Sequence, residues 1–381
     1  MNTNELGLGA PSLPDAILLG VTALTAMLML FFMVNVRSRT GAFVMGAAWL
    51  RYIMSAFHTV TYRPFVAGMS ANALGSIAMF GVGLLTINWR NLALRFLFPF
   101  YVLIAIAILS ALVNGQAVLS GLITVLTKYG YVIVITISVY EAMRKSKDGS
   151  FMASMLWAFL PAFIFQAFSI ALGISKHTET DANAVSFIGG YNHEAAFSVV
   201  LATCLTVACF AEKLNKQIRT GIVLVCLVGI FFANYRTTLV AIAPLLVAYF
   251  AFSSLRRFPV RDRPFVVSAL IVFSSIVFGI LALALADRFQ DVNIAAAGDV
   301  NFFKPPDKYS VDETRLLSGR PHIWSMYIYG WMLGDPLNQV IGFGPESWSG
   351  VFPLYAPNTL VNYLYEYGLV GVAGALFLWF S

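Results

Sequence analysis

The sequence has 381 residues, of which 59% are hydrophobic and only 11% are charged, and its formal net charge is +6 at pH 7. So few charged side chains cannot cover a soluble protein of this length, and the mean hydropathy of +0.79 is typical of a chain whose solvent is a lipid bilayer. The positive charge is therefore interpreted by its position relative to a membrane, and a nucleic-acid partner is not expected.

Apolar runs that approach the roughly 20 residues needed to cross a bilayer recur along the whole chain. They predict an all-α fold, in which one membrane domain, residues 1–381, is a polytopic bundle of transmembrane helices. The last run stops with the sequence, so either the sequence ends within a span or the native chain ends there. The first 15 residues contain no Lys or Arg, so no cleavable signal peptide is predicted. About eleven spans are expected, near residues 15–36, 41–59, 70–88, 93–113, 117–141, 152–173, 195–211, 219–235, 237–252, 265–286 and 358–381.

The Lys and Arg residues of the loops predict the orientation of the chain. One set of alternate loops contains 14 of them and the other set 8, of which 5 lie in one long loop near residues 287–357. The richer set is cytoplasmic by the positive-inside rule. The N-terminus and the 287–357 loop are therefore predicted to be extracytoplasmic, where no ATP is present and any reaction needs a substrate that is already activated.

The 287–357 loop contains local structure of its own. A helix is predicted over 320–333, because a Ser-Gly pair ending at Gly319 can cap it, Pro321 suits its first turn and Gly-Asp-Pro follows its end. Arg320 then stands at a helix N-terminus, where free N–H groups and the helix dipole favour an anion and the guanidinium adds a bidentate fork for phosphate. A capped loop helix with a surface arginine is the alternative interpretation.

Five short segments in the second half of the chain form an ordered set of motifs. They are GGYNHEAAFS at 189–198, NYRTTLVA at 234–241, GRPHIW at 319–324, GFGPESW at 342–348 and PNTLVNYLYEYGLVG at 357–371. The last three resemble the large-loop motifs of the O-antigen ligase/polysaccharide polymerase superfamily of polytopic membrane proteins. The first resembles a motif of the exopolysaccharide polymerases of that superfamily, and the second resembles its arginine motif that opens a span.

The resemblance implies a glycosyltransferase that works on the outer face of the bacterial inner membrane without a metal or another cofactor. Its donor is a glycan linked to undecaprenyl diphosphate, its arginines hold the diphosphate, and the sugar moves to an acceptor hydroxyl. Arg236 and Arg320 match the two arginines of the family motifs. The distribution of charge among the loops places both on the outer side without use of the resemblance.

The chain departs from the family pattern at two places. Pro357 precedes Asn358 where ligases carry His, and Glu194 and Ala195 replace the Lys and Asn of the exopolysaccharide motif. A general base must therefore come from elsewhere, and His193 or Glu194, at the outer end of the seventh span, can accept a hydroxyl proton. The alternative is that His193 is an interfacial residue and Glu194 a partner of the helix dipole.

Further candidates for substrate binding are charged or polar residues of the spans. Arg51 and Lys128 lie within predicted spans, and Glu366 lies about two turns into the last span, which Asn358 opens. Charged groups are costly in lipid and usually face the interior of a bundle. Arg51 and Lys128 are interpreted as a cationic floor under the diphosphate, and Glu366 as a group that orients an arginine. Pairing or snorkelling is the alternative.

The expected function is the polymerisation of undecaprenyl-diphosphate-linked repeats into surface polysaccharide, either O-antigen or exopolysaccharide. The first alternative is an O-antigen ligase, which transfers the glycan to lipid A-core, but the ligase-type His is absent at Pro357. Other polysaccharide-export proteins are further candidate partners. A transporter or flippase is the second alternative, because Pro99, Pro161 and Pro244 can break helices as in transporters. No metal site is expected, since the four histidines are scattered.

The predicted orientation is tested by single cysteines placed at Ser254 and Ser310 in a variant without the native cysteines. The cysteine at 310 should react with a membrane-impermeant maleimide added to intact cells, because the large loop is predicted to lie outside. The cysteine at 254 should react only after permeabilisation. The reverse pattern would contradict the predicted topology.

Overall fold

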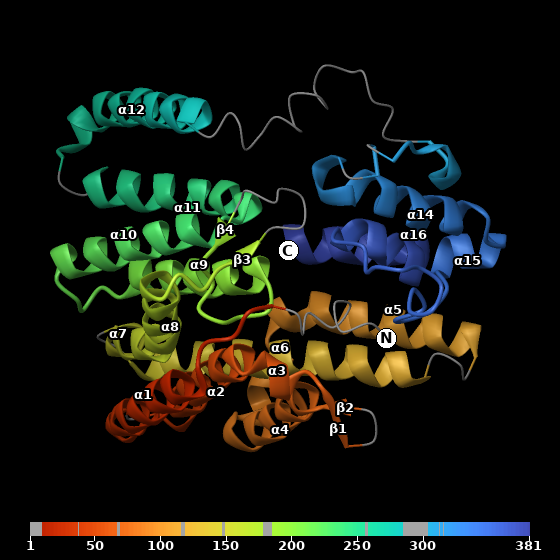
Figure 1. Ribbon diagram of the computed structural model, residues 1–381, viewed down its shortest axis with the longest axis horizontal. Helices are drawn as coiled ribbons and strands as arrows, with labels where there is room; N and C mark the ends of the chain where they lie inside the picture. Colours follow the sequence, from red (N-terminus) through yellow and green to blue (C-terminus); the bar gives the residue numbers. More distant parts are fainter. Residues whose placement is uncertain are drawn as a thin grey trace. The chain divides into compact units, whose positions relative to one another are not determined.

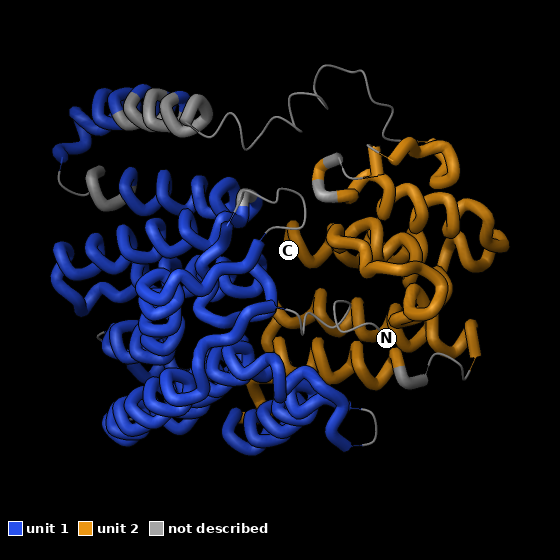
Figure 2. Tube along the Cα trace, viewed as in Figure 1, with its two compact units in different colours: residues 1–87, 134–279 blue, residues 88–133, 280–381 orange. Residues whose placement is uncertain are grey.

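The computed structural model describes residues 10–36, 38–66, 69–115, 119–146, 149–177, 185–255, 258–284, 304–311, 313–314 and 316–381. The chain divides into two compact units, coloured separately in Figure 2. Unit 1 comprises Met1–Ile87 and Val134–Gly279, and unit 2 comprises Asn88–Ile133 and Ile280–Ser381. The single membrane domain over 1–381 stays a prediction. Residues 287–303 of the predicted large loop lie outside the described part of the chain.

The fold is mostly helical, as predicted (Figure 1). Unit 1 also has two short antiparallel hairpins, β1 (Pro64–Val66) with β2 (Met69–Ser70) and β3 (Lys176–His177) with β4 (Val185–Ser186). Its helices are α1 (Asp15–Asn35), α2 (Arg39–Ala56), α3 (His58–Thr61), α4 (Ala71–Thr86), α7 (Ser150–Met155), α8 (Leu160–Ala171), α9 (Glu194–Phe210), α10 (Lys216–Ala233), α11 (Arg236–Leu255) and α12 (Arg263–Ala284). The helices of unit 2 are α5 (Phe98–Asn114), α14 (Arg320–Met332), α15 (Pro336–Ile341) and α16 (Thr359–Phe380), and α6 (Leu119–Lys145) begins in unit 2 and continues into unit 1.

Each of the predicted apolar runs coincides with helical structure, but not every helix is long and apolar enough to cross a bilayer. Among the described residues, six helices are long and apolar enough to do so. Three shorter apolar helices are Ala71–Thr86, Glu194–Phe210 and Thr237–Ala251. The count of about eleven spans therefore stays a prediction. The six are Asp15–Asn35, Arg95–Asn114, Gly121–Lys145, Ser150–Ala171, Lys216–Ala233 and Thr359–Phe380.

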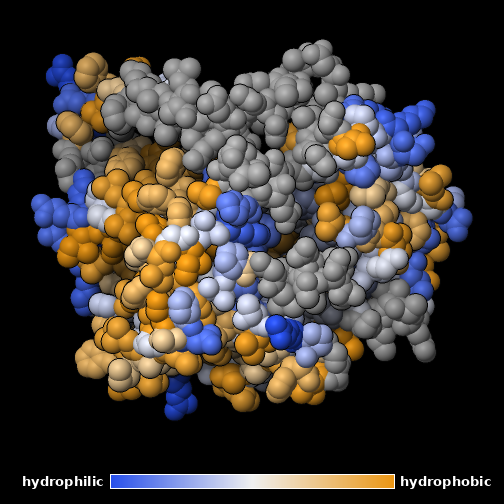
Figure 3. Space-filling model, viewed as in Figure 1, coloured by the Kyte–Doolittle hydropathy of each residue, from blue (hydrophilic) through white to orange (hydrophobic). Residues whose placement is uncertain are grey.

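Large apolar side chains lie on the surface of these helices, as Figure 3 shows for one face in orange. Val34, Leu85 and Phe380 are each more than 80% exposed, at 85%, 83% and 86%. Water does not tolerate such a surface over several whole helices, whereas lipid covers it at no cost. The protein is therefore membrane-associated.

One predicted span, at 152–173, contains a break. The chain passes from α7 through a 3-10 turn, Leu156–Phe159, into α8. Pro161 stands in the first turn of α8. Proline has no backbone N–H, and its ring conflicts with the carbonyl group four residues earlier, so a helix restarts at proline more readily than it continues through it.

The last apolar helix of unit 2, α16, is interrupted at Gly368, whose φ of 65° and ψ of −158° are not helical. The carbonyl groups of Tyr365 and Glu366 find donors outside the helix. The N–H groups of Phe343 and Gly344 donate to them at 3.0 and 2.9 Å. Ser110 of α5 adds a hydroxyl donor to the Glu366 carbonyl at 3.0 Å. These two carbonyl groups before the interruption thereby have protein donors.

The turn that supplies these donors fits only because glycines stand at the contact. A Cβ at Gly342 would lie 2.3 Å from the backbone of Glu366, and a Cβ at Gly368 would lie 2.4 Å from the backbone of Val340. Asn114 of α5 also donates to the Gly342 carbonyl at 3.0 Å. The GFGP and EYG segments, which resemble family motifs, thus form one structural contact between the turn and α16.

This contact predicts an unequal response to two glycine substitutions. Gly368→Ala forces a side chain into the Val340 backbone and into a φ that L-residues avoid, so the thermal midpoint should fall strongly. Gly350→Ala is the matched control, because Gly350 also has a positive φ of 84° but open space around a Cβ. It should cost about 1–2 kcal/mol. Thermal unfolding of the purified variants in detergent gives the comparison, and equal shifts would contradict the proposed contact.

Candidate functional site

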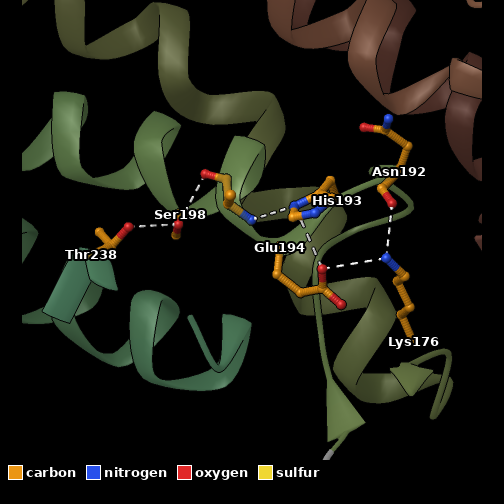
Figure 4. Close-up of polar contacts among 7 residues, drawn as sticks. Lys176, Asn192, His193, Glu194, Ser198 and Thr238 are labelled. Atoms are coloured by element: carbon orange, nitrogen blue, oxygen red, sulfur yellow. Dashed lines mark hydrogen bonds and ion pairs between the residues drawn. The ribbon is translucent and has the colours of Figure 1, made fainter. Parts of the chain in front are cut away.

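The N-termini of α9 and α11 lie side by side in unit 1 (Figure 4). Ser198, in the second turn of α9, shares a buried hydrogen bond of 2.8 Å with Thr238, in the first turn of α11. The ring of His193, just before α9, lies 6.4 Å from the ring of Tyr235, just before α11. Each helix start leaves backbone N–H groups without intrahelical partners and carries the positive end of a dipole. Two such ends at one place favour an anion.

A buried tyrosine holds the segment that enters α9. Gly189 and Gly190 both have positive φ, 60° and 79°, and form the turn before Tyr191. A Cβ at Gly189 would lie 2.9 Å from the backbone of α8, so a larger residue does not fit. The Tyr191 hydroxyl donates to the carbonyl of Tyr52 on α2 at 2.9 Å, and its ring meets the edge of Phe197 at 5.0 Å. The residues after Tyr191 are thereby placed at the start of α9.

His193 is the N-cap of α9. Its Nδ1 accepts a hydrogen bond of 3.0 Å from the backbone N–H of Ala195. An accepting Nδ1 carries no proton, so the neutral ring carries its proton on Nε2. His193 Nδ1 also lies 3.6 Å from Glu194 Oε2, so the cap of α9 and this carboxylate are neighbours (Figure 4).

Glu194, the first residue of α9, is buried and paired with Lys176 of β3. The Lys176 ammonium lies 3.3 Å from Glu194 Oε2 and donates to the Asn192 carbonyl at the same distance (Figure 4). The two side chains are only 16% and 10% exposed. An ion pair with so little water is screened weakly, so it fixes the carboxylate in place.

The prediction from sequence did not single out Lys176. It stands 18 residues before Glu194 in the chain. β3 and β4 pair as an antiparallel hairpin in which Lys176 lies opposite Ser186, and the chain then continues to α9. The sequence indicated only that Lys176 is one of the eight Lys and Arg residues in the loops predicted to be extracytoplasmic.

Arg236 is the first residue of α11. Asn234, in the left-handed conformation with φ of 54°, ends α10 and lets the chain turn back into α11. Because the starts of α9 and α11 are neighbours, the structure brings the Arg236 backbone and Glu194 to the same end of unit 1. Arg51 has another environment: its guanidinium donates to the side chains of Asn72 and Ser76 on α4. Arg51 thus links α2 to α4.

The other predicted site residues belong to unit 2. Arg320 is the first residue of α14, after the N-cap Gly319 with φ of 71°. Asn358 is the N-cap of α16, and its side-chain oxygen accepts from the N–H groups of Leu360 at 2.9 Å and Val361 at 3.4 Å. Glu366 is buried two residues before the interruption of that helix. Lys128 is exposed and lies 2.5 Å from Glu346.

Within the described ranges of the chain, no group of three or more His, Cys, Asp or Glu side chains could hold a metal ion. The candidate site consists of helix starts and charged side chains. Its residues in unit 1 are Arg236, the first residue of α11, and the six residues labelled in Figure 4, which are Lys176, Asn192, His193, Glu194, Ser198 and Thr238.

The Lys176–Glu194 pair makes a prediction about stability. Lys176→Met leaves a buried carboxylate without its partner and should lower the free energy of unfolding by about 3–5 kcal/mol. The double variant Lys176→Met/Glu194→Gln should be more stable than Lys176→Met alone, because neither charge remains. Lys128→Met is the control, since that side chain is 64% exposed in its own pair and should cost less than about 1 kcal/mol. Unfolding in detergent measures all three variants, and equal losses at Lys176 and Lys128 would contradict the pair.

Comparisons of the chain with models of protein families, with curated proteins and with solved structures found no match. The function is therefore inferred from the residues described above and from the motifs that resemble the O-antigen ligase/polysaccharide polymerase superfamily.

Proposed function

We propose that the protein is a glycosyltransferase that polymerises undecaprenyl-diphosphate-linked oligosaccharide repeats into surface polysaccharide. The observation that carries the proposal is the convergence of the α9 and α11 N-termini in a membrane-associated protein, with Lys176 beside them and Arg236 opening α11. Two helix dipoles and an arginine at the start of one of the helices together suit the diphosphate of a lipid-linked donor. The proposed location is the bacterial inner membrane, with the N-terminus and this site on the periplasmic side.

The proposed reaction exchanges one glycosidic bond for another. The oxygen of the acceptor hydroxyl bonds to the anomeric carbon of the donor sugar, and the bond from that carbon to the diphosphate oxygen breaks. Undecaprenyl diphosphate leaves with the electron pair, and Glu194 accepts the hydroxyl proton. Negative charge grows on the leaving diphosphate, so cations and helix N-termini stabilise the transition state more than the ground state.

The second arginine of the family motifs, Arg320, belongs to unit 2. It opens α14, a helix of 13 residues, and a guanidinium suits a diphosphate oxygen pair. Asn358, the N-cap of α16, and Glu366, near its interruption, are further residues proposed to bind substrate. Arg51 is left out of the proposed donor site, because its guanidinium already donates to α4.

The arginine assignment predicts large losses of activity. Arg236→Ala and Arg320→Ala should each reduce the rate of polymerisation by about 10²–10³, as loss of one transition-state donor typically does. Lys should rescue poorly at both positions, because the bidentate fork is lost. Arg261→Ala is the control, since Arg261 is exposed in the turn before α12. The readout is the amount and length of surface polysaccharide at matched protein levels, and a normal polymer with Arg320→Ala would contradict the assignment.

A deletion strain separates the polymerase from its alternatives. Loss of a polymerase should leave single repeats, which the host's own ligase attaches to lipid A-core. Loss of a ligase should instead leave long polymer on undecaprenyl diphosphate and a bare core. Loss of a flippase should leave lipid-linked single repeats on the cytoplasmic face. Either of the last two patterns would overturn the polymerase in favour of that alternative.

A further inference from the structure

A cluster of aromatic and charged side chains in unit 2 is not used by the proposed donor chemistry. It is formed by α6, by the segment between α15 and α16 and by the second turn of α16. We call it the aromatic cluster, and its members are Lys128, Tyr129, Glu346, Trp348, Tyr355 and Tyr363.

Glu346 is the polar centre of the aromatic cluster. Its Oε1 lies 2.5 Å from the Lys128 ammonium, and its Oε2 accepts a hydrogen bond of 3.1 Å from the Trp348 indole N–H. Its backbone has a φ of 58°, which costs energy for a residue other than glycine. Both oxygens are thus fixed in place, and each keeps a lone pair for a further donor.

The aromatic rings are also held before any ligand arrives. The Trp348 and Tyr355 rings meet edge to face, 5.4 Å apart at 74°. The buried Tyr327 hydroxyl donates to the Leu354 carbonyl at 3.0 Å and accepts from the Ala356 N–H at 3.2 Å. The residues on both sides of Tyr355 are therefore fixed. Such preorganisation lowers the entropy lost on binding.

The cluster has an open side. The Tyr355 residue is 48% exposed, and the Lys128 side chain is 64% exposed. Burial raises the pKa of Tyr355, and the nearby carboxylates of Glu366 and Glu346 raise it further. The Tyr355 phenol therefore stays neutral, as a donor, beside two carboxyl groups.

The charge of the aromatic cluster does not suit a diphosphate. The Lys128 ammonium is already paired with Glu346, and the Glu366 carboxyl near Tyr355 adds no positive charge. Lys128 is therefore not interpreted as a cationic floor. Aromatic faces with a fixed carboxylate suit a pyranose ring, whose C–H face packs on an aromatic face and whose hydroxyls donate to carboxylate oxygens.

We propose that the aromatic cluster is a glycan subsite that binds an uncharged sugar of the acceptor by stacking on Trp348 and Tyr355 and by hydrogen bonds to Glu346. The assignment to the acceptor rests on the proposed polymerase function. The binding of a sugar to the cluster does not.

The test uses the full-length protein in detergent micelles. The probe is the reducing oligosaccharide released by mild acid from the host's own lipid-linked repeats, which carries no diphosphate. Its dissociation constant is measured by titration for the wild type and for Trp348→Ala, Tyr355→Ala and Tyr355→Phe. Trp348→Ala and Tyr355→Ala should each weaken binding by about tenfold or more, whereas Tyr355→Phe, which keeps the ring, should stay within about threefold. Trp379→Ala is the matched control, because Trp379 is 55% exposed near the end of α16, and should leave binding unchanged.

Several outcomes would overturn the subsite. They are no binding to the wild type, equal binding to the wild type and Trp348→Ala, and equal losses with Tyr355→Phe and Tyr355→Ala. If Trp348→Ala does not fold, the two Tyr355 variants decide the question. If polymerisation depends on Arg236 and Arg320 but binding does not depend on the cluster, the subsite fails and the proposed function stands. If Trp348→Ala weakens binding of the probe but the deletion strain still makes normal polymer, the proposed function fails and the glycan site stands.

Discussion

A backbone group inside a bilayer has no water to bind, so every break in an apolar helix must be satisfied by protein. The break at Gly368 in α16 is where this constraint acts on unit 2. There the carbonyl groups of Tyr365 and Glu366 accept hydrogen bonds from the N–H groups of Phe343 and Gly344 and from the hydroxyl of Ser110. The turn that carries those N–H groups is therefore held against α16. The aromatic cluster begins two residues after that turn, so its geometry depends on the same contact.

The same need for protein partners explains the contacts of the charged residues in the apolar part of unit 1. Arg51 donates to polar side chains of α4, and Glu194 is paired with Lys176. A buried charge without a partner would cost several kcal/mol, so these contacts are a condition of folding. The exception is the pair of helix starts at α9 and α11, whose N–H groups and dipoles add positive potential that an anion can use.

Two resemblances to family motifs have a structural explanation in this fold. The glycines of GFGP and EYG are needed where the backbone of the turn approaches the backbone of α16. They therefore say little about chemistry. The remaining motif residues, Arg236, Arg320 and the pair His193–Glu194, stand at helix starts, which are local features of the backbone.

The sequence by itself determined the helical class, the approximate ends of the helices and the helix starts at Glu194, Arg236 and Arg320. These features depend on the length of apolar runs and on cap residues, which are local properties of the chain. It did not reveal Lys176 as the partner of Glu194, or Glu346 with Trp348 and Tyr355 as a cluster. Only the tertiary structure decided these contacts, because a hairpin register, a positive φ at Glu346 and the Gly368 interruption bring together residues whose separation in the chain carries no periodic signal.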